Sequence, residues 1–149
     1  MTHYARRLAL LAEGRFTPFD AKTAVGLLRY RPHEVAAVID GTRAGGTAEA
    51  CVGVGGAIPV VATLEAAAAT GANALLGGVA PQGGGLPESW RAIVLGALAR
   101  GWDVWSGLHE FLSDDEAFVA AARAGGGRVH DVRRPPAGRP IAARRAAKV

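Results

Sequence analysis

Short apolar runs alternate with stretches of helical periodicity along most of this chain. The runs are apolar throughout and do not alternate with polar residues, as is typical of parallel strands whose two faces are both covered by helices. Strand, helix and strand repeated in this order predict a Rossmann-like α/β fold, a doubly wound, mostly parallel sheet with helices on both faces. The expected strands cover residues 8–12, 34–40, 58–62, 72–80, 102–108 and 127–132.

Four of the connections between these runs predict helices. The first is expected to begin near Thr17, a capping residue, because Pro18 suits a first helical turn. The last is expected to begin with a capping box, in which Ser113 caps the helix and Glu116 reaches back. The connection over residues 41–56 is long and glycine-rich and is expected to be irregular. The predicted helices cover residues 17–30, 64–71, 86–101 and 113–127.

Length and composition restrict the class of protein further. The chain has 149 residues, half of them hydrophobic, which predicts one folded core and excludes a disordered chain. Cys51 is the single cysteine, so the chain forms no internal disulfide and no cysteine-based metal site, and a reduced, cytoplasmic setting fits. No apolar run has the length of a membrane span, so we expect no membrane partner.

Positive charge is concentrated at the end of the chain. Residues 133–149 hold six of the 17 cations and none of the 13 acidic residues. We expect a Rossmann-like domain over residues 1–136 and a basic tail rich in Pro, Ala and Arg over residues 137–149. Such a composition is typical of a linker; a nucleic-acid-binding tail is the alternative, although the tail has no aromatic residue.

Polar residues and glycines follow several of the expected strands. Ligands of open parallel sheets bind at the carboxyl ends of the strands, so these loops are expected to meet at one ligand-binding edge. These candidate residues also have structural interpretations. Asp40 suits a turn, Lys22 suits an exposed position on a helix, and the glycines after residue 80 suit a mobile loop. The candidate cofactor-binding residues are Glu13, Gly14, Lys22, Thr23, Asp40, Pro81, Gly83, Ser106 and Gly107.

The segment SGLHEFLSDD, residues 106–115, holds the one candidate for acid–base chemistry. A capping box accounts for SDDE without any reaction, but it does not require His109. An imidazole in a strand-end loop suits a general acid or base, and a solvated loop histidine is the alternative. No G-x-S-x-G surrounds Ser106, and neither a Walker loop nor a G-x-G-x-x-G fingerprint is present where these motifs are required.

Seven stretches together resemble one known family. They are AEGRF, DAKTAVGLLRY, PHEVAAVID, GGAIPVVATLEAA, ANALLGGVAPQGGGLPESWR, SGLHEFLSDD and DVRRPP. From about residue 8 to residue 136 the chain is similar to the N-terminal Rossmann-like domain of the DgcN-type D-glutamate N-acetyltransferase family, long catalogued as a domain of unknown function. In that family a P-loop domain with a nucleotide-binding loop follows, so the tail reads as a linker to a P-loop partner absent here.

The resemblance implies acetyl transfer from acetyl-CoA to the amine of D-glutamate or a related amino acid, with the isolated domain inactive. Such a reaction needs a base and cations for the substrate carboxylates. His109 is the candidate base, and Arg29, Arg43 and Arg133 are candidate carboxylate ligands. A weaker similarity of residues 55–81 to the CoA-binding domain of succinyl-CoA ligases favours CoA as the ligand. The alternative function is a noncatalytic nucleotide- or CoA-binding or dimerisation module, and a homo-oligomer is compatible with either function.

Overall fold

The predicted doubly wound sheet is confirmed. The computed structural model describes residues 6–79, 86–108 and 110–133. Its strands pair in parallel in the order β3-β2-β1-β4-β5-β6, the order of a Rossmann-like sheet. The strands are β1 (Leu8–Leu11), β2 (Val35–Ile39), β3 (Val60–Val61), β4 (Ala74–Gly77), β5 (Asp103–Ser106) and β6 (Arg128–Asp131).

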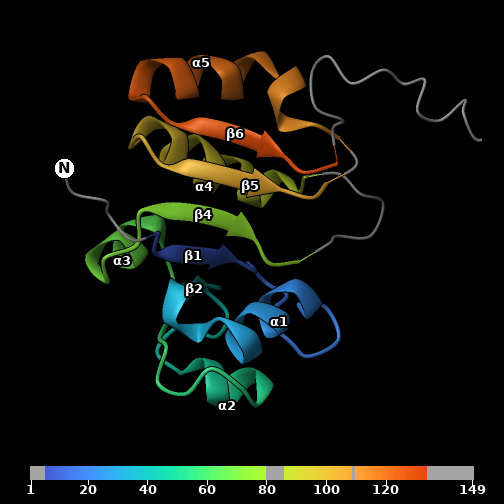
Figure 1. Cartoon of the computed structure of the whole chain (residues 1–149), viewed down its shortest axis with the longest axis vertical. Helices are drawn as coiled ribbons and strands as arrows, with labels where there is room; N and C mark the ends of the chain where they lie inside the picture. The colour runs from blue at the N-terminus through green and yellow to red at the C-terminus, as the bar shows by residue number, and fades with distance from the viewer. Residues whose placement is uncertain (1–5, 80–85, 109, 134–149) are drawn as a thin grey trace, which may run out of the picture.

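Helices lie on both faces of this sheet (Figure 1). Because parallel crossovers are right-handed, the helices change face where the strand order reverses, between β1 and β4. One face carries α1 and α2, and the other carries α3, α4 and α5, which pack on one another in sequence. The helices are α1 (Lys22–Tyr30), α2 (Ala48–Val52), α3 (Leu64–Ala69), α4 (Glu88–Ala99) and α5 (Glu116–Gly125).

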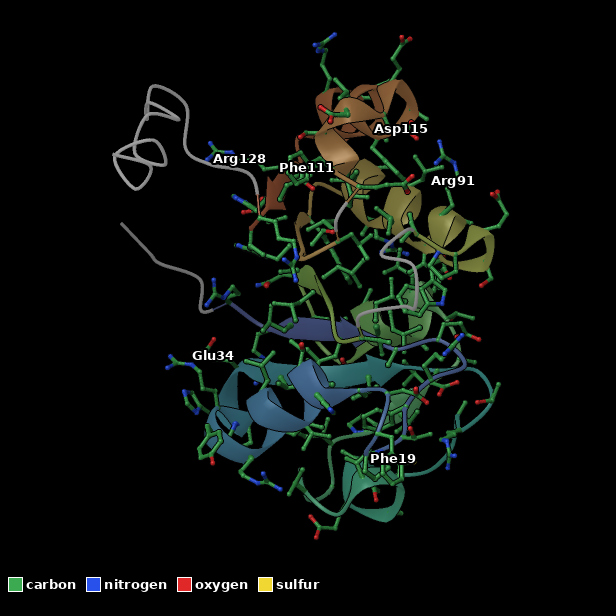
Figure 2. All side chains as sticks on the ribbon, turned by 90° about the vertical axis from the view of Figure 1, so that its right-hand side faces the viewer. Phe19, Glu34, Arg91, Phe111, Asp115 and Arg128 are labelled. Carbon is green, nitrogen blue, oxygen red and sulfur yellow. The ribbon has the colours of Figure 1, made fainter. Side chains whose placement is uncertain are left out.

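The central strands form the core. All residues of β1 and β2 are buried, which explains why their sequences are apolar without alternation. At the other end of the sheet, α5 is held against α4 by Arg91, whose guanidinium lies 2.9 Å from the Asp115 carboxylate and 4.6 Å from the centre of the Phe118 ring. Figure 2 shows Arg91 and Asp115 at this boundary. Among the described residues no helix is long and apolar enough to cross a bilayer.

Among the described residues, aromatic and charged side chains pack on one another along β5 and β6. The rings of Trp105 and His130 stack with their centres 4.5 Å apart, and the Arg6 guanidinium lies 5.0 Å from the centre of the Trp105 ring. His130 Nε2 is 3.3 Å from the Asp103 carboxylate. These side-chain contacts therefore join half-buried residues of β5 and β6 to Arg6, which precedes β1.

The predicted start of the first helix was wrong. The helix α1 begins at Lys22, after Ala21, which offers no side-chain cap. Thr17 instead closes a separate turn, in which the Asp20 amide donates to Thr17 Oγ1 at 3.1 Å and the Ala21 amide donates to the Thr17 carbonyl at 3.0 Å. The cap and the proline thus belong to a turn that precedes the helix.

The predicted capping box at Ser113 was also wrong. Ser113 lies in a 3-10 turn, η2 (Leu112–Asp114), and α5 is capped by Asp115, whose carboxylate accepts from the Ala117 amide at 2.9 Å. The amides of Leu112 and Ser113 donate to Asp131 at the end of β6, at 2.8 and 3.0 Å. This tertiary contact engages the segment at Ser113, so the cap moves to Asp115.

The connection over residues 41–56 is not wholly irregular. It contains α2, a five-residue helix whose first turn is capped by Thr47, which accepts from the Ala50 amide at 3.2 Å. The helix ends at Gly53, which adopts a left-handed backbone with φ of 82°. A helix this short gives little periodicity in the sequence, which is why the pattern did not predict it.

Candidate functional site

A cavity of about 320 Å³ opens at the carboxyl ends of β1, β4 and β5. Strand order reverses between β1 and β4, and this is the place where ligands of doubly wound folds bind. The lining residues come from these strands, from the loops that follow them and from α1, α4 and η2. They are Leu11, Thr23, Leu75, Leu76, Gly77, Val79, Leu86, Trp90, Val94, Val104, Trp105, Ser106, Gly107, Leu108, Leu112, Val132 and Arg133.

Large apolar side chains dominate the wall. Trp90 is 3% exposed and is fixed by its indole Nε1, which donates to the carbonyl of Glu13 at 3.0 Å. Val94, one helical turn further along α4, is 2% exposed and lines the same cavity. Among the described lining residues, the polar side chains are those of Thr23, Ser106 and Arg133, and no carboxylate or imidazole is present.

The loops after β5 and β6 are tied together at the edge of this cavity. The Val132 amide donates to the Ser106 carbonyl at 2.9 Å, and Arg133 Nε donates to the Gly107 carbonyl at 2.7 Å. Ser106 Oγ accepts from the Leu108 amide at 3.2 Å. These contacts bring Ser106, Gly107 and Arg133 together, and the Arg133 guanidinium is the single charged group among the described lining residues.

Asp40 and Glu13 connect the loops after β1 and β2. The buried Asp40 carboxylate accepts from the amides of Gly14, Phe16 and Thr42 at 3.0, 3.1 and 2.9 Å, and from Thr42 Oγ1 at 2.7 Å. Burial alone would raise the pKa of Asp40, but the hydrogen bonds from Thr42, Gly14 and Phe16 outweigh burial and hold this pKa below its ordinary value.

The Glu13 carboxylate accepts from the Gly41 amide at 2.8 Å. Glu13, Gly14 and Asp40 are not lining residues of the cavity. Their described contacts give them a structural role, which is to hold the loops that border the site.

The start of α1 also lies at this edge. The Ala24 amide donates to the Gly78 carbonyl at 3.1 Å, which joins the first turn of α1 to the loop after β4. Thr23 lines the cavity, whereas Lys22 is exposed and lies beside the site. Lys22 is therefore the neighbour of a lining residue and is not one itself.

Arg29 and Arg43 are not brought to the cavity. Arg29 lies in the last turn of α1, at the amino edge of the sheet, and Arg43 is exposed in the loop after β2. Figure 2 labels one residue near each edge of the sheet. Phe19 follows β1, at the carboxyl edge, and Glu34 precedes β2, at the amino edge. Neither arginine is among the described lining residues, and only Arg29 lies at the edge opposite the cavity.

Three of the candidate residues, His109, Pro81 and Gly83, lie outside the described residues. Their nearest described neighbours in sequence, Leu108, Val79 and Leu86, line the cavity. Our sequence reasoning missed the wall contributed by α4, because it looked only at strand-end loops. The signal for this wall was available in the helical spacing of Trp90 and Val94, which places both on one side of α4.

Comparisons with known proteins agree with this architecture. Residues 41–135 match the family described as a domain of unknown function (DUF1611_N), a Rossmann-like domain. The chain is 37% identical over 123 residues to a D-glutamate N-acetyltransferase of Tritonibacter scottomollicae; the match covers 82% of this chain and 34% of that protein.

A crystal structure gives the same assignment. A DUF1611 family protein of Anabaena variabilis superposes with a TM-score of 0.80 at 31% identity, covering 97% of this chain and 42% of that one. The chain thus spans well under half the length of both relatives. The match to the family model, the identity and the shared fold lead to one assignment: this chain belongs to the DUF1611 family, through its N-terminal Rossmann-like domain.

Proposed function

We propose that this chain is the N-terminal domain of an N-acyltransferase that moves an acetyl group from acetyl-CoA to D-glutamate or a related amino acid. The observation that carries the proposal is its 37% identity to a D-glutamate N-acetyltransferase over most of the chain. Because the chain spans 34% of that relative, we propose that a P-loop domain supplies the rest of the catalytic site. The single cysteine supports a cytoplasmic location.

The chemistry sets what the complete site must hold. A base removes a proton from the substrate ammonium, and the free amine attacks the thioester carbonyl. The C–N bond forms, the nitrogen of the tetrahedral intermediate loses a second proton, the C–S bond breaks, and the CoA thiolate leaves and takes up a proton. Hydrogen-bond donors must face the oxyanion of the tetrahedral intermediate. We assign the base to His109, which follows the lining residue Leu108.

A noncatalytic CoA- or nucleotide-binding module is the second candidate function. It is favoured by one observation, that the described lining residues include no group that titrates near neutral pH. In this case the cavity binds its ligand and performs no reaction. The two functions differ in whether any acetyl transfer depends on this domain.

A chimera distinguishes the two functions. In the Tritonibacter relative, this chain replaces the segment that it matches, and N-acetyl-D-glutamate and released CoA thiol are measured together. We expect turnover by the chimera and by the intact relative, and none by this chain alone. A chimera that melts cooperatively yet gives no product would contradict the acyltransferase proposal. His109→Ala in the active chimera tests the base, and unchanged turnover would remove His109 from the mechanism.

A further inference from the structure

We propose that the cavity at the carboxyl ends of β1, β4 and β5 takes the uncharged arm of the acyl donor, the pantetheine chain with its thioester, and that the charged amino acid binds outside it. This inference rests on the proposed function, because it assigns one of the two substrates of that reaction to this domain. Within that reaction, the chemistry of the wall decides which of the two substrates binds in the cavity.

The wall does not suit a free amino acid with two carboxylates. D-glutamate carries two negative charges and one positive charge, and a buried charge is costly unless it is paired. The described wall offers one cation, Arg133, whose Nε already donates to the Gly107 carbonyl. It offers no carboxylate for the ammonium group. Two of the three charges would therefore lack partners there.

The same wall suits an uncharged chain. Pantetheine is a chain of methylene and methyl groups with two amides, hydroxyl groups at its pantoyl end and a terminal thiol, and it carries no charge. Its apolar groups would pack on Trp90, Trp105 and Val94, which come from α4 and β5. The Thr23 hydroxyl lines the cavity, and the Ser106 hydroxyl, which accepts from the Leu108 amide, keeps its own proton to donate to a carbonyl of the chain. A cavity of about 320 Å³ is also far larger than an acetyl group needs, which favours the arm together with the acyl group.

The edge of the cavity fixes the orientation of the donor. Val132 lines the cavity and is 64% exposed, so it marks the opening, and Arg133 follows it directly. The exposed Lys22 lies next to the lining residue Thr23. The phosphates of CoA are strongly charged and stay outside, within reach of these two cations, while the thioester points inward.

Tryptophan fluorescence tests the inference on the unmodified chain. Trp90 and Trp105 line the cavity, whereas Trp102 does not, so ligand binding in the cavity changes the emission of two of the three tryptophans. The probes are acetyl-CoA, pantetheine, D-glutamate and octanoate. We expect saturable changes with acetyl-CoA and with pantetheine, and affinity at least tenfold lower for D-glutamate and octanoate. Tighter binding of D-glutamate, or of octanoate as a free acyl chain, would overturn the assignment.

A matched pair of variants locates the ligand. Val94→Phe extends into the cavity from α4, and Ile93→Phe makes a similar change at the adjacent position, which does not line it. We expect Val94→Phe to weaken pantetheine binding at least tenfold and Ile93→Phe to change it less than twofold. Thermal melts confirm that both variants fold. If Val94→Phe does not fold, ligand-detected NMR with pantetheine and D-glutamate on the unmodified chain tests the same assignment. Equal pantetheine affinity in both folded variants would overturn the assignment.

The outcomes separate this inference from the proposed function. If the chimera acetylates D-glutamate but the chain does not bind pantetheine, the inference fails and the function stands. If pantetheine binds and Val94→Phe blocks it, but the chimera transfers no acetyl group, the function fails and the cavity assignment stands.

Discussion

Replacement of Asp40 by Ala is expected to destabilise the fold strongly, because this carboxylate joins two loops from inside the protein. The carboxylate is fully buried and accepts hydrogen bonds from three backbone amides, those of Gly14, Phe16 and Thr42. Leaving a buried donor unpaired costs about 1–3 kcal/mol. Partial relaxation of the loops reduces the sum, so we expect a loss of about 3–5 kcal/mol in the free energy of unfolding. At this chain length the melting temperature falls by roughly 10 °C.

The matched control is Asp131→Ala. Asp131 also accepts three hydrogen bonds, from the amides of Leu112 and Ser113 and from the Ser113 hydroxyl, but it is only partly buried. Water can replace the lost carboxylate there, so we expect a loss of about 1–2 kcal/mol. Urea unfolding followed by circular dichroism measures both losses, and an unchanged m-value validates the comparison. Equal losses in the two variants would refute the argument that burial makes the Asp40 hydrogen bonds costly to lose.

Further changes test other parts of the structure. Since the pKa of Asp40 is held below the value of about 3.9 for an unfolded aspartate, its contribution to stability is present above that pH and is lost as the pH falls through the folded pKa. The difference in unfolding free energy between the wild type and Asp40→Asn should therefore shrink as urea titrations move from pH 6 to pH 3. Gly26→Ala, inside α1, should stabilise the chain by about 0.5–1 kcal/mol because its Cβ meets no neighbour. Gly125→Ala should destabilise it by about 1–3 kcal/mol in the same assay, because its Cβ would collide with backbone carbonyls of α4. In fluorescence titrations, Arg133→Ala should weaken acetyl-CoA more than pantetheine, whereas Arg29→Ala, at the opposite edge, should change neither.

The sequence alone predicted the class of fold and the approximate position of each strand. The runs that became β1 and β2 are apolar on both faces, and a parallel sheet that is covered by helices buries such runs completely. Strand ends were predicted less well, because hydrogen bonding sets them: the run over residues 58–62 yields only Val60–Val61 as strand. Local composition indicates which residues are buried, but it does not indicate at which residue the hydrogen bonds between two strands end.

Capping was misjudged where tertiary contacts competed with local signals. Ser113 has the sequence context of a helix cap, but its hydroxyl and its amide both donate hydrogen bonds to the Asp131 carboxylate. Asp131 is 18 residues away in sequence, so no local pattern contains this contact. The cap of α5 therefore depends on how β6 is placed beside β5.

The candidate site divides in the same way. The chain itself predicted that Ser106 and Gly107 would lie at the carboxyl edge of the sheet, because the carboxyl ends of parallel strands meet there. Only the tertiary structure decided that Asp40 and Glu13 hold loops, that Arg29 and Arg43 are not among the described lining residues, and that Trp90 forms part of the wall. The physical reason is that the direction of a strand fixes the edge of the sheet on which a strand-end residue lies. The contacts of that residue depend on side chains from elements that are distant in sequence.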